Sequence, residues 1–244
     1  MIVEAIEQLL RDRCTPAAVR EMEASGDAGP LLRTFEEAGF LDLLRPEEEG
    51  GAALPLPEFH AVLLQFGRHA APVALAEAIA TRGGAPLPLH FAAAIHASLI
   101  AGAMARSFDL TLQYCNQRAQ FGRTLGKFQA VQHQLAEMAE LVTAVGMAAE
   151  AAFQAAGRMP DLLPAAIAKA RASEAAVQVA NTAHALHGAI GITAEYDLQL
   201  FTRRLHAWRM AHGSESYWHR IVGEQLLASE GSVADFVIQP RRPA

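Results

Sequence analysis

Residues 118–129 place glycines beside cationic side chains, a combination that suits a phosphate group. The segment reads Arg-Ala-Gln-Phe-Gly-Arg-Thr-Leu-Gly-Lys-Phe-Gln. Gly122 and Gly126 would let the backbone approach a ligand closely, and the guanidinium of Arg118 can bind a phosphate or pyrophosphate through two hydrogen bonds. A cationic helix end followed by a glycine turn gives the same pattern, so the residues alone leave both interpretations open.

The spacing of the histidines argues against a metal site. His184 and His187 lie three residues apart, and His206, His212 and His219 follow. A zinc site on helices needs such a pair together with a third ligand and a nearby acid, as in H-E-x-x-H, and this motif does not occur. The G-x-S-x-G turn of serine hydrolases is also missing. We therefore expect no metal.

Composition and charge favour a folded cytoplasmic protein. Hydrophobic residues make up 52% and charged residues 19% of the 244, and the net charge of −6 argues against a nucleic-acid partner. Cys14 and Cys115 lie far apart and are expected to be reduced thiols. The N-terminus lacks the basic region of a signal peptide. Residues 83–105 carry no charge, but Pro86 and Pro88 favour a buried helix of a bundle over a membrane span.

Apolar residues recur at helical spacing along most of the chain, which predicts an all-α fold. Thr15 and Ser214 are expected to cap the helices that follow them, and Pro16 to occupy a first helical position. No segment shows the alternation typical of a β-strand. The main helices are expected at residues 2–13, 30–39, 58–68, 90–117, 128–156, 164–186 and 194–210.

A glycine- and proline-rich segment divides the chain. Residues 83–88 are expected to link an N-terminal helical domain at 1–82 to a C-terminal four-helix bundle at 89–230. Residues 231–244 end in Pro-Arg-Arg-Pro-Ala and are expected to form a loosely ordered tail.

Three motifs resemble the acyl-CoA dehydrogenase family and occur in the family's order. The first is R-x-Q-F-G-x-x-L-x-x-F-Q at 118–129, followed by Leu-Ala-Glu-Met at 135–138. The second is His-Gly-Ala-Ile-Gly-Ile-Thr-Ala-Glu-Tyr at 187–196, similar to the family's H-G-G-x-G loop. The third joins Glu-Ala-Gly-Phe-Leu at 37–41 to Pro-Glu-Glu-Glu-Gly-Gly at 46–51.

The resemblance implies FAD-linked α,β-dehydrogenation of acyl-CoA thioesters, and it implies roles for four residues. Arg118 matches an arginine that contacts the FAD pyrophosphate of a neighbouring subunit. Phe121 matches an aromatic residue packed beside the flavin nucleotide, and Gln129 an amide at its adenosine end. Gly188 falls on the glycine loop that the nucleotide passes.

The chain departs from the family in two ways that bear on catalysis. A β-domain of about a hundred residues normally stands between the two helical regions, and here only residues 83–88 are available. The family's catalytic glutamate aligns with His212, and a second family position for this base falls near Ala92. An imidazole can act as a general base, but a solvent-exposed histidine before a helix N-cap is the favoured interpretation of this position. In addition, Ala189 replaces a loop glycine, which would block a positive φ there.

These observations leave two functional hypotheses. The chain is either a half-site subunit that lends Arg118, Phe121 and Gln129 to the FAD of a full-length acyl-CoA dehydrogenase, or a flavin-free helical protein that binds other proteins or thioesters such as acyl-CoA. As a lone chain it is expected to be inactive or incomplete. The alanine-rich helix at 128–156 has few charges after Glu140, which predicts that it forms the interface of a homo- or hetero-oligomer.

Overall fold

The computed structural model describes residues 1–82, 84 and 86–238, and this part of the chain is almost entirely helical. The predicted all-α class is confirmed. The N-terminal helices are α1 (Ile2–Arg13), α2 (Pro16–Ser25), α3 (Gly29–Glu37), α4 (Leu56–Arg68) and α5 (Val73–Thr81). The helices that follow are α6 (Leu89–Gln117), α7 (Gln129–Ala152), α8 (Leu162–His187), α9 (Leu198–Met210), α10 (Glu215–Ala228) and α11 (Val233–Ile238).

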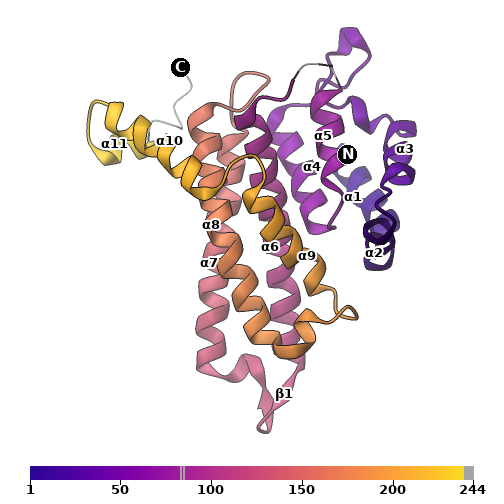
Figure 1. Ribbon diagram of the computed structural model, residues 1–244, viewed down its shortest axis with the longest axis vertical. Helices are drawn as coiled ribbons and strands as arrows, with labels where there is room; N and C mark the ends of the chain where they lie inside the picture. The colour runs from indigo at the N-terminus through magenta and orange to yellow at the C-terminus, as the bar shows by residue number, and fades with distance from the viewer. Residues whose placement is uncertain (83, 85, 239–244) are drawn as a thin grey trace.

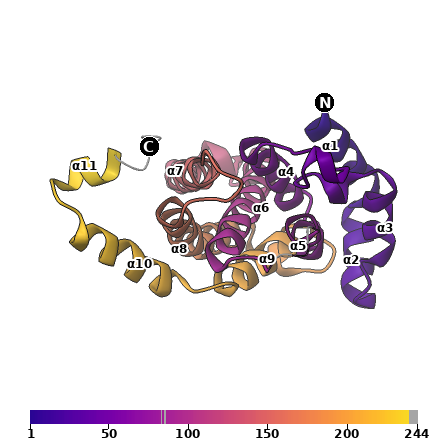
Figure 2. The ribbon, with the colours of Figure 1, turned by 90° about the horizontal axis from the view of Figure 1, so that it is seen from above.

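Four long helices run up and down to form a bundle (Figure 1). α6 descends, α7 rises, α8 descends again and α9 rises toward α10. The N-terminal helices pack on one side of the bundle, and α10 and α11 extend on the opposite side (Figure 2). Trp218 anchors α10 to the bundle, since its side chain is 1% exposed and packs on alanines of α6 and α8.

α6 is the central element of the fold. It is long and apolar enough to cross a membrane, but 83% of its most apolar window is buried inside the protein, as expected for the core helix of a bundle. α4 crosses it at two glycines, Gly67 and Gly102. A Cβ on Gly102 would lie 2.2 Å from the carbonyl oxygen of Leu64, so the two backbones touch at this crossing. Only glycine allows the N-terminal helices to pack this closely on the bundle.

The expected helix caps are confirmed. The Thr15 side chain accepts a hydrogen bond from the Ala18 amide, and Pro16 is the first residue of α2. The Ser214 side chain accepts one from the Tyr217 amide at the start of α10. Both caps satisfy an amide that the helix itself leaves unpaired.

Several boundaries differ from expectation. α7 ends at Ala152 rather than at residue 156, and α9 begins at Leu198 rather than 194 because a 3-10 helix, η4 (Gly188–Ile192), precedes it. The expected loosely ordered tail is wrong over Val233–Ile238, which forms α11 with Phe236 buried. Of the predicted linker, residues 83 and 85 lie outside the described part, as do residues 239–244 of the tail. Three further 3-10 turns are η1 (Phe40–Asp42), η2 (Glu47–Glu49) and η3 (Leu125–Lys127).

Candidate functional site

The segment that joins α6 to α7 forms a β-hairpin that projects from one end of the bundle (Figure 1). Strands β1 (Ala119–Gln120) and β2 (Arg123–Thr124) are antiparallel, with Gln120 opposite Arg123. Phe121 and Gly122 form the two-residue turn with φ of 53° and 78°. Positive φ at both positions is typical of a type I′ turn. A phenylalanine in this conformation costs about 1–2 kcal/mol, so the turn holds Phe121 in a strained backbone.

The strained turn displays an aromatic ring to solvent. The Phe121 side chain is 91% exposed, and its ring makes only an edge contact with Phe128 at 6.4 Å between centroids. The Arg123 guanidinium lies 4.0 Å above the Phe128 ring, an arrangement that fixes the second strand against the start of α7. The hairpin is therefore held against the start of α7 and carries an exposed phenyl ring at its tip.

Arg118 and Gln129 flank the hairpin. The Arg118 amide bonds the Tyr114 carbonyl and its own carbonyl accepts from the Leu125 amide, so its backbone is fixed at the end of α6. Its side chain is exposed and makes no hydrogen bond or ion pair with any described residue. Gln129 is the exposed first residue of α7. The structure thus brings Arg118, Phe121 and Gln129 together at one end of the bundle, facing solvent.

Gly188 lies at the same end and closes α8 with a φ of 65°. Ala189, which replaces a glycine of the family motif, belongs to η4 and does not have a positive φ, so its methyl group causes no backbone strain here. The His187 ring stacks on Tyr114 of α6 at 4.5 Å between centroids, and its Nε2 lies 3.2 Å from the Tyr196 hydroxyl. These contacts tie the loop to α6; the sequence motifs include Tyr196 but not Tyr114.

His212 lies at the other end of the bundle, in the sharp turn between α9 and α10. Its φ is 55° and that of Gly213 is 99°. The Trp218 indole nitrogen donates a hydrogen bond to the His212 carbonyl at 3.0 Å. The expected solvent-exposed histidine is therefore wrong, because the side chain is only 34% exposed and its backbone is held in a strained turn.

Two ionisable groups from other helices face His212. Its ring centroid is 4.6 Å from that of His96 on α6, and its Nε2 is 3.8 Å from an oxygen of Glu77 on α5. Burial lowers the pKa of His96 to about 4, so this ring is neutral near pH 7. Its Nδ1 bonds the Ala92 carbonyl at 3.0 Å, which leaves Nε2 as a hydrogen-bond acceptor. His96 follows Ala92, the second family position for the base, by one helical turn.

A buried ammonium holds this turn in place. Lys169 on α8 is fully buried, and its Nζ donates to the carbonyls of Trp208, Arg209 and Gly213 and to the Ser173 hydroxyl at 2.8–3.2 Å. Burial lowers its pKa to about 8, which still leaves it protonated near pH 7. The cation meets the carbonyl end of α9, where the helix dipole favours positive charge.

The two predicted groups of site residues are far apart. His96 and Arg118 lie near opposite ends of α6, about 33 Å from each other along the helix axis. A ligand bound at the hairpin through its phosphates therefore meets Arg118, Phe121 and Gln129, and is remote from His212. In the described part of the chain no three metal-ligating side chains cluster.

Two family models match the chain. "Acyl-CoA dehydrogenase, C-terminal domain" matches residues 87–227, and "Acyl-CoA dehydrogenase, N-terminal domain" matches residues 1–98. Because the first match alone covers more than half of the 244 residues, the chain belongs to the acyl-CoA dehydrogenase family.

Curated relatives match part of the chain. The acyl-CoA dehydrogenase IpdE2 of Mycolicibacterium smegmatis is 40% identical over 105 residues, which are 43% of this chain and 32% of the relative. The glutaryl-CoA dehydrogenase of Desulfococcus multivorans is 36% identical over 121 residues, 49% of this chain and 31% of the relative. The matched region thus spans about a third of these relatives.

Two solved structures share the fold over nearly their whole length. A chain of the Tcur3481–Tcur3483 steroid ACAD, crystallised as a variant, superposes with a TM-score of 0.80 and 21% identity, covering 92% of this chain and 96% of the other. A chain of the ChsE4–ChsE5 complex from Mycobacterium tuberculosis gives 0.79 and 17%, covering 94% and 97%. These identities show a common fold, and chains with this fold occur in hetero-complexes.

Members of the acyl-CoA dehydrogenase family generally bind FAD, and the hairpin fits the nucleotide half of that group. Gly122 is open to solvent, with no heavy atom within 4 Å of where a Cβ would be, so phosphates could approach its backbone. Arg118 offers a guanidinium that no described residue neutralises. No β-domain that could cover a flavin ring is found among the described residues.

Proposed function

We propose that the chain is a subunit of a hetero-oligomeric acyl-CoA dehydrogenase that completes the FAD site of a partner carrying a β-domain. One observation carries the proposal: three exposed side chains suited to a nucleotide lie at one end of the bundle, and the residues that the structure describes include no β-domain to cover a flavin. We infer that such a site needs residues of a second chain before it can hold FAD.

Each residue has a distinct role in this proposal. Arg118 would bind the pyrophosphate through two charge-assisted hydrogen bonds, Phe121 would pack against the nucleotide, and Gln129 would donate its amide at the adenosine end. Gly188, tied to α6 through His187, would leave room for the chain of phosphates. When bound, FAD accepts a hydride from the acyl β-carbon. The exposed, partner-free state of these side chains fits residues that meet their ligand across an interface.

The kind of partner follows from the chemistry that is missing. It must supply a β-domain and a carboxylate base, since His212 and Ala92 occupy the two base positions here. A chain of the ChsE4–ChsE5 type, with the same fold and in a complex with a second acyl-CoA dehydrogenase chain, gives a precedent for such an arrangement at the level of fold. A full-length acyl-CoA dehydrogenase is the partner we propose, with an acyl-CoA thioester as substrate.

The alternative is a flavin-free scaffold that retains the helical fold for protein or thioester binding. The missing carboxylate at both base positions favours it. The two functions differ in one measurable property, because only the half-site subunit changes the FAD affinity of its partner.

The test is FAD titration into the complex with a β-domain-bearing acyl-CoA dehydrogenase. Replacing Arg118 with alanine should weaken FAD binding by about ten- to hundredfold, the worth of a charge-assisted bidentate contact. Arg118→Lys should recover only part of the affinity, since an ammonium keeps the charge and loses the fork geometry. Lys127→Ala, which removes an exposed cation of the same segment, is the matched control and should have little effect.

His212→Ala separates binding from chemistry. We expect almost no change in FAD affinity, because His212 is remote from the hairpin. Equal FAD affinities for the wild type and Arg118→Ala would overturn the half-site function. A loss of turnover confined to His212→Ala, with FAD binding intact, would assign the base to this histidine.

A further inference from the structure

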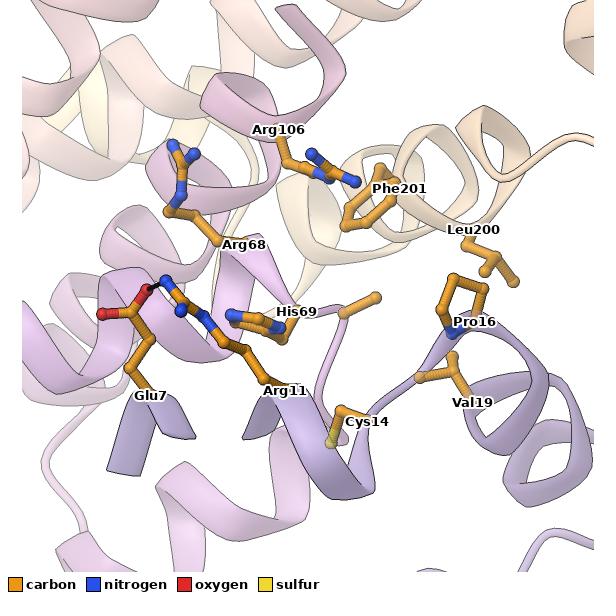
Figure 3. A pocket seen from close by; sticks show the side chains of 11 residues that line it. Glu7, Arg11, Cys14, Pro16, Val19, Arg68, His69, Arg106, Leu200 and Phe201 are labelled. Atoms are coloured by element: carbon orange, nitrogen blue, oxygen red, sulfur yellow. Dashed lines mark hydrogen bonds and ion pairs between the residues drawn. The ribbon is translucent and has the colours of Figure 1, made fainter. Parts of the chain in front are cut away.

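A pocket lies away from both groups of site residues, between the N-terminal helices and the bundle (Figure 3). Its volume is about 250 Å³, and its walls come from α1, α2, the end of α4, α6 and α9. This volume is below the range of about 300–1,000 Å³ typical of pockets for drug-sized ligands. Any ligand that fills the pocket must therefore be small.

One wall of the pocket is cationic. Arg11, Arg68, Arg106 and His69 line it, together with a single acid, Glu7. Arg11 is paired with Glu7 at 2.5 Å, as Figure 3 shows, and Arg68 with Asp109 outside the pocket at 2.6 Å. Arg106 is half-buried and makes no hydrogen bond or ion pair with any residue that the structure describes. An unpaired guanidinium in a partly dry site is a ready partner for an anion.

The opposite wall is apolar. Val19 and Leu200 are each 1% exposed and Phe201 is 5% exposed, so each side chain is packed in the core and presents only a small part of its surface to the pocket. Pro16 and Ala70 complete this wall. In Figure 3 the apolar side chains from α2 and α9 lie across the pocket from Arg11 and Arg68. A ligand that fits both walls has a charged end and an apolar end.

The pocket is held open by ion pairs between the elements that form it. Arg20 of α2 donates to Asp197 at the start of α9 at 2.7 Å, and Glu23 of α2 accepts from Arg203 and Arg204 of α9. Burial lowers the pKa of His69 below its usual range, and the three arginines act in the same direction while Glu7 opposes them. These ion pairs fix the positions of α2 and α9 before a ligand binds, which lowers the entropic cost of binding.

The charge of the lining distinguishes between anions. Three arginines against Glu7 leave a charge of +2, and Asp109 behind Arg68 reduces it to +1. This balance suits a monoanion better than a dianionic phosphate, and a carboxylate matches the planar fork of Arg106. From these contacts we propose that the pocket binds a small carboxylate with a short unbranched apolar tail, the carboxylate on Arg106 and the tail against Leu200 and Phe201.

The test is calorimetric titration of the full chain with sodium hexanoate, acetate and phosphate at matched ionic strength. Hexanoate should bind saturably and at least about tenfold more tightly than acetate, because each buried methylene is worth about fourfold in affinity. Arg106→Gln should weaken hexanoate binding at least tenfold, and Arg106→Lys should weaken it less. Arg13→Gln, at an exposed position of α1 outside the pocket, is the control and should bind as the wild type does.

Arg106 supports no internal ion pair within the described residues, so its replacement should leave the fold intact, which circular dichroism checks. The proposal is overturned by non-saturable binding, by equal affinity in Arg106→Gln, by acetate binding as tightly as hexanoate, or by phosphate binding more tightly than either.

Discussion

The imidazole rings of His96 and His212 lie 4.6 Å apart, although 116 positions separate them in the sequence. His96 is buried on α6 and His212 sits in the strained turn that Lys169 and Trp218 hold. Where the family has a carboxylate, this chain has two imidazoles in contact, their planes inclined at 58°, with Glu77 beside them. Of this pair His96 is neutral near pH 7, because burial lowers its pKa to about 4.

Buried neutral histidines should make the fold sensitive to acid. Burial lowers the pKa of His60 and of His96 from 6.5 to about 4. Between these pH values the two histidines are protonated in the unfolded chain but remain neutral in the folded chain. The free energy of unfolding therefore falls as the pH falls from about 6.5 to about 4. Each group contributes about 3 kcal/mol to this fall. His60→Gln should remove the contribution of His60, about 3 kcal/mol, from this fall in urea denaturation measured at several pH values.

His133→Gln is the matched control for this experiment, since His133 is exposed on α7. In this variant the free energy of unfolding should fall by as much as in the wild type when the pH is lowered from about 6.5 to about 4. If the free energy of unfolding of His60→Gln fell with pH as steeply as that of the wild type, His60 would not be a source of the acid sensitivity.

The crossing of α4 and α6 should not tolerate a methyl group. Gly102→Ala places a Cβ 2.2 Å from the Leu64 carbonyl oxygen, so the helices must separate. We expect a loss of about 2–3 kcal/mol in the free energy of unfolding. Gly223→Ala in α10, where nothing lies within 4 Å of the new methyl group, should instead be neutral or stabilising by up to about 1 kcal/mol. Thermal unfolding of the two variants should therefore shift in different directions, and a shared shift would refute the close contact.

The chain purified alone should be colourless. The hairpin offers contacts for a nucleotide, but the described part of the chain has no domain to exclude water from a flavin ring. The measurement is the visible absorption spectrum of the purified chain. Stoichiometric FAD in that preparation would contradict the expectation.

The outer face of α7 should mediate self-association or association with the partner. Only Leu135, Met138, Val145, Ala149 and Ala152 of this helix are buried, and Met147 is 58% exposed among alanines. Light scattering at micromolar concentration should show an oligomer. Met147→Glu should lower the measured mass, whereas Gln134→Glu, on the more polar first half of the helix, should not. A monomeric wild type would exclude self-association through this face.

Features that depend on neighbouring residues could be predicted from the sequence. The Thr15 and Ser214 caps and the extent of α6 follow from side chains within one turn of each boundary, and all three are confirmed. The family motifs placed Arg118, Phe121 and Gln129 on one segment, and the structure gathers them at one end of the bundle. Their roles toward FAD stay predictions.

Features that depend on distant residues could not be predicted. The hairpin rests on four paired residues and on a positive φ at Phe121, which phenylalanine rarely adopts. The His96–His212 pair and the arginine pocket each require helices from separate parts of the chain to meet. α11 was missed because its six residues give too short a pattern to distinguish from a loop.

The unbroken length of α6 fixes a spacing that the rest of an assembly must match. Its 29 residues span about 43 Å, and they carry His96 near one end and deliver Arg118 at the other. The helix is expected to keep this length without bending, because α4 packs directly against its middle at Gly102. A partner that contacts both ends of α6 must therefore have two binding surfaces separated by about the same distance. Lengthening α6 by seven residues, two turns that preserve its buried face, would displace the hairpin by about 10 Å and put the two ends out of register with any such partner.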